Sequence, residues 1–193
     1  MDLVPKNIPY FEKMFSSGFT KWVYSDAEGY SSGNGAMMRI SGVGYLFNST
    51  EDIIENVKLA TIPSHNNPSS IENASNVAMI IFLSRIGYSK EKIIESLNLD
   101  IKYVPFKEFN MTCDTTIDNC LYALFTSNNF EEAITKVISY GGDTDTNACI
   151  VGSMAEAMYG IDKELINNIK DKLPKQFTDL LSLAYKRVKE YEK

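Results

Sequence analysis

The stretch SYGGDTDTNACIVGSMAEAMYG, residues 139–160, sets a glycine pair and two closely spaced aspartates before a run of small and apolar residues. Small residues then recur at helical spacing, namely Ala148, Gly152 and Ala155. This spacing predicts a helix over 146–159 that packs closely on a neighbouring helix. Asp143 and Asp145 cannot share one helix face, but at a loop-to-helix junction both can turn toward one point. The stretch therefore predicts a tightly packed helix with acidic side chains at its start.

These acids have two interpretations. One is a site for a hard cation, because carboxylate and hydroxyl oxygens without nearby histidine or cysteine suit Mg²⁺, Mn²⁺ or Ca²⁺. The other is a helix cap, in which Asp143 or Thr144 is the N-cap residue and Asp145 complements the helix dipole. An EF-hand loop is excluded, because Ala148 stands where the sharp turn needs glycine and Met154 where a bidentate glutamate belongs.

Helical periodicity continues on both sides of this stretch, from residue 49 to the end of the chain. Further helices are expected over 71–85, 89–97, 115–127 and, capped by Asn129, over 130–139. Ser49 is expected to cap another, Asp162 to start one, and Pro174 to open the last one from a first-turn position. The last helix is expected to turn its apolar residues inward, namely Phe177, Leu180, Leu181, Ala184 and Val188. No strand pattern of convincing length occurs. The sequence predicts one compact all-α domain over 1–193, with an irregular, loop-rich region at 1–48 and helices over 49–193.

Composition excludes several classes of protein. A formal net charge of −6 and a pI near 4.9 argue against a general binder of nucleic-acid backbones. No apolar run reaches the roughly 20 residues of a membrane span, and no signal peptide is visible, so a cytoplasmic location is expected. The three cysteines, Cys113, Cys120 and Cys149, form no CxxC pair and are expected to be small buried residues.

Three blocks in order resemble the ADP-ribosylglycohydrolase family, which includes dinitrogenase-reductase-activating glycohydrolase. They are SSGNGAMMR at 31–39, SHNNP at 64–68, and GGDTDT at 141–146 followed by the small-residue helix. The resemblance implies an all-α domain that carries two Mg²⁺ or Mn²⁺ ions in a cleft. It also implies hydrolysis of the glycosidic bond of ADP-ribosyl adducts, on a protein or on a small molecule that contains ADP-ribose.

Site residues follow from this resemblance. Asp143, Asp145 and Thr146 would be metal ligands. The loop at residues 31–35 would hold the diphosphate and distal ribose through backbone N–H groups, and its members are Ser31, Ser32, Gly33, Asn34 and Gly35. His65 would contact the ribose or phosphate of the substrate, although a histidine satisfied within the fold is an equal alternative. Arg39 would meet a phosphate or form an ion pair at the base of the loop.

The sequence departs from the family pattern at its start. Neither the G-D-A-x-G segment nor the T-D-D-T segment, which supply the other metal ligands and the catalytic acid, occurs in it. Three oxygen ligands from one turn fall short of the 6 or more that Mg²⁺ or Ca²⁺ takes. The domain is therefore expected to be N-terminally truncated relative to the family, with an exposed apolar patch beside residues 148–155 unless another element covers them. The alternatives are an incomplete hydrolase, a non-catalytic ADP-ribose-binding remnant, or half of a split enzyme completed by an N-terminal polypeptide or a homo-oligomer.

Overall fold

The computed structural model describes residues 17–191, and in this part of the chain the regular elements are all helices, with no strand. The helices are α2 (Ser17–Val23), α3 (Gly35–Met38), α4 (Ser41–Leu46), α5 (Thr50–His65), α6 (Pro68–Arg85), α7 (Lys90–Ser96), α8 (Cys113–Phe125), α9 (Phe130–Ser139), α10 (Thr144–Tyr159), α11 (Lys163–Lys170) and α12 (Lys175–Tyr191). The predicted all-α class is confirmed.

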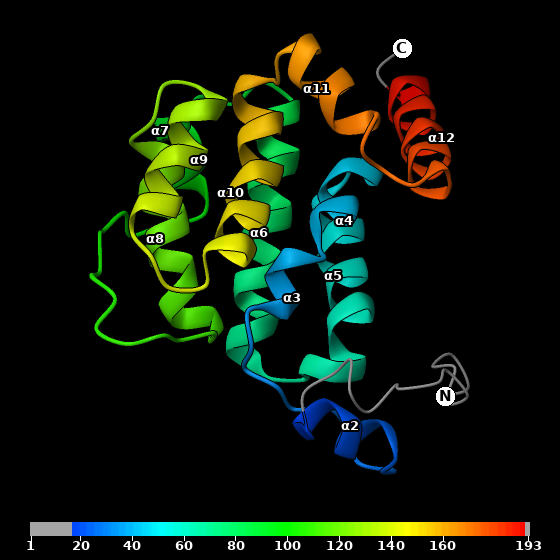
Figure 1. The fold of residues 1–193 in the computed structure, drawn as a ribbon, viewed down its shortest axis with the longest axis vertical. Helices are drawn as coiled ribbons and strands as arrows, with labels where there is room; N and C mark the ends of the chain where they lie inside the picture. The colour runs from blue at the N-terminus through cyan, green and yellow to red at the C-terminus, as the bar shows by residue number, and fades with distance from the viewer. Residues whose placement is uncertain (1–16, 192–193) are drawn as a thin grey trace.

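Two long helices, α6 and α10, stand side by side in the middle of the molecule (Figure 1). Helices α8 and α9 cover one flank of this pair, and α3, α4 and α5 cover the other (Figure 1). The continuous apolar run at 77–83 of α6 is buried on every side, which is the pattern of a helix at the centre of a domain. The central pair therefore provides a rigid support for the loops at its ends.

Close packing between helices depends on two glycines. A Cβ added to Gly152 in α10 would come within 3.3 Å of Ile134 Cδ1 in α9. A Cβ added to Gly44 in α4 would come within 2.6 Å of the Ala78 carbonyl oxygen in α6. Helix α9 thus covers the small-residue face of α10, and the predicted exposed patch beside residues 148–155 is not found there. Ala155 is fully buried.

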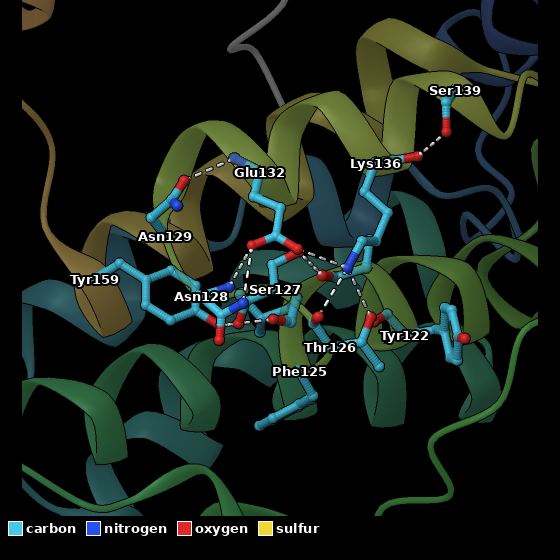
Figure 2. Close-up of polar contacts among 12 residues, drawn as sticks. Tyr122, Phe125, Thr126, Ser127, Asn128, Asn129, Glu132, Lys136, Ser139 and Tyr159 are labelled. Atoms are coloured by element: carbon cyan, nitrogen blue, oxygen red, sulfur yellow. Dashed lines mark hydrogen bonds and ion pairs between the residues drawn. The ribbon is translucent and has the colours of Figure 1, made fainter.

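The carboxyl end of α8 is fixed by side chains from three other helices. Tyr159 donates to the carbonyl oxygens of Leu124 and Ser127, at 2.7 and 2.8 Å. Lys90 also donates to the Ser127 carbonyl. Lys136 donates to the Thr126 carbonyl at 2.7 Å (Figure 2). Cations favour the carboxyl end of a helix, where free carbonyls carry partial negative charge. This network holds the α8 end that is remote from the 31–35 loop.

Several expectations about the periphery are wrong. The region 1–48 was predicted to be irregular because few of its residues show a helical period, yet three short helices, α2, α3 and α4, lie in it. Residues 1–16 of that region lie outside the described residues. The last helix keeps only Val188 of its apolar face buried, while Phe177, Leu180 and Leu181 are exposed. A cavity of about 180 Å³ remains between α12 and helices α4 and α10. Cys149 is exposed, whereas Cys113 and Cys120 are buried as expected.

Candidate functional site

Asn34 joins the 31–35 loop to the start of α10. Its side-chain amide nitrogen donates to Asp143 Oδ2 at 2.8 Å and lies 3.2 Å from Thr116 Oγ1 in α8. The Asn34 side chain is buried, so these bonds are shielded from water and fix its orientation. Residues that are 109 positions apart in the sequence therefore meet at one point, where α3, α8 and α10 begin.

The segment before α3 is held by backbone bonds to two other segments. On one side Ser31 N donates to the Ser64 carbonyl at 3.2 Å, and Asn66 N donates to the Gly29 carbonyl at 2.7 Å. Gly29 permits this approach, since a Cβ there would lie only 2.6 Å from the Ser64 carbonyl carbon and oxygen. The segment that carries His65 is thereby placed against the 31–35 loop.

The other side of the loop is bound to the segment that leads into α8. Asn34 N donates to the Met111 carbonyl at 2.7 Å, and Cys113 N donates to the Ser32 carbonyl at 2.8 Å. Below the loop, Ser70 Oγ donates to the Ser31 carbonyl at 2.9 Å. The loop is thus a fixed element of the structure with both edges bonded.

These bonds reduce the number of backbone N–H groups that the loop offers to a ligand. The N–H groups of Ser31 and Asn34 are bonded to backbone carbonyls, and that of Gly33 donates to Ser31 Oγ at 3.1 Å. Among the described residues no partner is found for the N–H groups of Ser32 and Gly35. The 31–35 loop therefore offers a ligand two backbone N–H donors directly, and a third if Ser31 Oγ turns away from Gly33.

The His65 ring lies next to Gly33 and Gly35 of the loop, and its two nitrogens have different surroundings. Nδ1 is 3.0 Å from an Arg39 nitrogen and 2.8 Å from Ser64 Oγ. Nε2 is 3.5 Å from the position that a Cβ on Gly35 would occupy. Partial burial, and then the charge of Arg39, lower the pKa of His65 from 6.5 to about 4. The ring is therefore neutral at pH 7, and Arg39 contacts His65 rather than a carboxylate.

Asp143 occupies the N-cap position of α10, yet its side chain makes no capping hydrogen bond. Its carboxylate turns instead toward Asn34. Gly141 and Gly142 allow this backbone path with φ angles of 77° and 73°, which residues other than glycine rarely adopt. Gly142 also lies against the ring of Phe106, 3.1 Å from where a Cβ would be. Of the two interpretations of this motif, a capping role for the Asp143 side chain does not fit the structure.

Asp145 lies beside Asp143 in the first turn of α10. A hydrogen bond with the Asp143 carboxyl group lowers the pKa of Asp145, and the backbone N–H groups of Asp145 and Thr146 lower it further. Asp145 is exposed, whereas Thr146 is 8% exposed. The structure thus places two adjacent carboxyl groups and a buried threonine in the same helical turn.

The donors present suit a hard cation in kind but not in number. Carboxylate and hydroxyl oxygens are the ligands that Mg²⁺ and Mn²⁺ take, and Asp143 and Asp145 lie side by side. Among the described residues, however, no group of three or more His, Cys, Asp or Glu side chains could hold a metal ion. Such a cation would need further oxygens from water, from a ligand or from another polypeptide.

The sequence patterns did not predict two features near this site. Thr116 lies near the Asn34 amide, and the Asp114 carboxylate accepts from Asn73 at 3.0 Å and also from Ser69. Both belong to the first turn of α8, which begins at Cys113, two residues before the predicted start. The polar string TCDTT at 112–116 was the available signal.

Comparisons with known proteins show what this chain is similar to. Residues 11–193 match the family model described as ADP-ribosylglycohydrolase. An uncharacterized protein of Archaeoglobus fulgidus is 24% identical, over 80% of this chain and 60% of that protein. The ADP-ribosyl-dinitrogen-reductase glycohydrolase of Rhodospirillum rubrum is 23% identical, over 86% of this chain and 61% of that enzyme.

A solved structure also shares the fold. A chain of an ADP-ribosylglycohydrolase-related protein complex superposes with a TM-score of 0.59 and 19% identity, covering 92% of this chain and 63% of that one. The chain thus spans about three fifths of the length of these relatives. None of the described helices is long and apolar enough to cross a bilayer.

Proposed function

Because the chain belongs to the ADP-ribosylglycohydrolase family, we propose that its site binds ADP-ribosyl groups and serves in hydrolysis of their glycosidic bond, assisted by Mg²⁺ or Mn²⁺. One observation carries the proposal, the bond from Asn34 to Asp143 Oδ2 that brings the 31–35 loop to the acidic turn. A loop with two free backbone N–H groups, next to a pair of carboxyl groups that could hold a cation, suits an anionic nucleotide ligand.

Each part of the site would have its own task. The N–H groups of Ser32 and Gly35 would bind an anionic oxygen of the ligand, and His65 would act as a neutral donor beside them. Asp143 and Asp145 would hold the cation, with Thr146 as a third oxygen. A bound Mg²⁺ or Mn²⁺ would orient the ribose hydroxyl groups and activate a water molecule.

An activity assay tests this proposal. The full chain is incubated with ADP-ribosylated protein and Mg²⁺, and released ADP-ribose is compared for wild type, Asp143→Ala with Asp145→Ala, and Asp171→Ala. Asp171 is an exposed acid at the end of α11 and serves as the matched control. Loss of release in the double variant alone supports the proposal, and equal release from all three chains refutes the role of the two acids.

A second function is favoured by the small number of acidic ligands among the described residues. In this alternative the chain binds ADP-ribose without hydrolysing it, or becomes catalytic only with a complementing polypeptide or a second copy. Calorimetry with ADP-ribose distinguishes the cases. Metal-independent binding without turnover supports the binding module, whereas turnover by the chain with Mg²⁺ alone rejects it.

A further inference from the structure

The imidazole of His65 lies between an arginine and the glycines of the 31–35 loop. One Arg39 nitrogen, Nη2, is 3.0 Å from His65 Nδ1 and 2.6 Å from Ser64 Oγ. Ser64 Oγ is in turn 2.8 Å from Nδ1, so the three groups form a closed triangle. The opposite nitrogen, Nε2, lies 3.6 and 3.5 Å from the positions that Cβ atoms on Gly33 and Gly35 would occupy. The ring therefore separates a cationic side from the loop side.

Arg39 determines which ring nitrogen carries the proton. A guanidinium group has N–H donors and no acceptor, so the atom that faces it at hydrogen-bonding distance must supply a lone pair. If Nδ1 carried the proton, two N–H groups would face each other at 3.0 Å. Ser64 adapts to either arrangement, because its hydroxyl group both donates and accepts. The geometry therefore requires a lone pair on Nδ1 and leaves the proton of the neutral ring on Nε2.

We propose that Arg39, together with Ser64, is a positioning residue that holds His65 as the neutral tautomer with its proton on Nε2, so that the ring presents one N–H donor to an oxygen of the ligand at the 31–35 loop. The identity of this ligand rests on the function proposed above, whereas the tautomer rests on the contacts alone. The donor adds to the two free N–H groups of the loop, which makes the site selective for anionic or hydroxyl oxygen.

The glycines of the loop keep this nitrogen accessible. The backbone of Gly33 and Gly35 does not require glycine, since neither residue has a positive φ angle. A methyl group at Gly35 would meet Nε2 at 3.5 Å and Cε1 at 3.7 Å, which are ordinary van der Waals distances. Alanine therefore fits at this position, but its methyl group would cover the N–H of His65. Glycine at 35 leaves space for a ligand oxygen to reach that group.

The charges around the ring support the same arrangement. Neither Arg39 nor His65 forms an ion pair with a carboxylate of the described residues. The carboxylate of Glu28 accepts from Asn66, the residue after His65, at 3.3 Å. Burial and the Arg39 charge lower the pKa of His65 to about 4, and burial also lowers the pKa of Arg39. A protonated His65 would place two cations side by side, so the ring stays a neutral donor.

Nitrogen NMR of the ring tests the tautomer without any ligand. His65 is the only histidine of the sequence, so ¹⁵N labelling of histidine gives a single set of ring resonances. The full chain is compared as wild type, Arg39→Met, Arg39→Lys and the control Arg187→Met in α12. We expect wild type and control to carry the proton on Nε2 at pH 7 and to titrate at about 4. Arg39→Met should mix the tautomers and raise the titration midpoint toward 6.5, and Arg39→Lys should restore the wild-type tautomer because it keeps a donor.

Three results would overturn the proposal. One is a wild-type proton on Nδ1, and another is an Arg39→Met chain, folded by circular dichroism, with an unchanged tautomer and midpoint. The third concerns added ADP-ribose. We expect ADP-ribose to shift the Nε2–H resonance of wild type and to bind about tenfold more weakly to Gly35→Ala. Binding that leaves this resonance unmoved refutes the donor role. Failure of ADP-ribose to bind refutes the proposed function as well, while the tautomer is still decided by the ligand-free spectra.

Discussion

Replacing Gly29 with alanine should separate the 31–35 loop from the segment that carries His65. A Cβ at this position would lie 2.6 Å from the carbonyl carbon and oxygen of Ser64 and closer still to its Cα. These are backbone atoms, so no flexible side chain can move aside. Overpacking of this kind costs about 1–3 kcal/mol. Shifting the segments also weakens the bonds from Ser31 to Ser64 and from Asn66 to Gly29, each worth about 1 kcal/mol. We expect a total loss of about 3 kcal/mol.

Thermal and urea unfolding measure this loss, which should lower the melting temperature by about 9 °C in a chain of this size. Gly42→Ala in α4 is the matched control, because a Cβ there meets nothing within 4 Å and alanine favours a helix. Hydrogen exchange of the Ser31 and Asn66 amides reports the local effect, and both should exchange faster in Gly29→Ala. If Gly29→Ala is as stable as Gly42→Ala, the close backbone contact does not hold the site together.

Three other changes probe the site and its support. Asn34→Asp adds a third carboxyl group next to Asp143 and Asp145 and should lower the stability of the fold by about 2 kcal/mol without metal. Millimolar Mg²⁺ should restore part of this loss, which melting curves with and without Mg²⁺ measure. Identical curves would contradict a cation site. Tyr159→Phe removes the donor to the Leu124 and Ser127 carbonyls and should cost about 1 kcal/mol in urea unfolding, with unchanged ADP-ribose binding. The lowered pKa of His65 means that the unfolded chain binds the proton first as pH falls, so wild type loses stability between pH 6.5 and about 4. His65→Gln should lose about 1 kcal/mol less over this range, a figure that allows for solvent screening of a half-exposed ring. Unfolding free energies that fall in parallel in both chains would argue against it.

Local signals in the sequence identified most of the helix starts. Ser49, Asn129 and Asp162 each accept a hydrogen bond from a backbone N–H in the first turn of the helix that follows, as their residue types predict. A cap depends on residues two or three positions away, so the sequence contains nearly all the information it needs. Helix α8 begins two residues before its predicted start, and its cap residue, Thr112, makes no side-chain bond to the helix.

The burial of α12 could not be predicted in the same way. Helical periodicity shows that Phe177, Leu181 and Val188 share a face, but it does not show whether another element lies against that face. In the structure only Val188 is covered, while Phe177 and Leu181 are exposed. Burial of a peripheral helix depends on contacts distant in sequence, which a single sequence does not reveal.

The motifs picked out segments that are far apart in the sequence, and the structure brings these segments together and shows how they are bonded to one another. The 31–35 loop, His65 and the acidic turn were all expected to be near one another. The pairing of the loop with Met111 and Cys113 was not foreseen; in it Asn34 N donates to the Met111 carbonyl and the Ser32 carbonyl accepts from Cys113 N. Such pairing is set by the path of the segment before α8, and that segment carries no helical or strand period from which its position could be inferred.

The arrangement of charge around Asp143 supports the cation interpretation beyond the motif itself. Its bonded partner is the neutral amide of Asn34, and its other close neighbour is a second carboxyl group, that of Asp145. No lysine or arginine of the described residues forms an ion pair with either acid. Two adjacent carboxylates repel each other unless a proton or a cation lies between them. The Asn34 amide orients the Asp143 carboxyl group without bringing a positive charge to it, which is compatible with the cation proposed above.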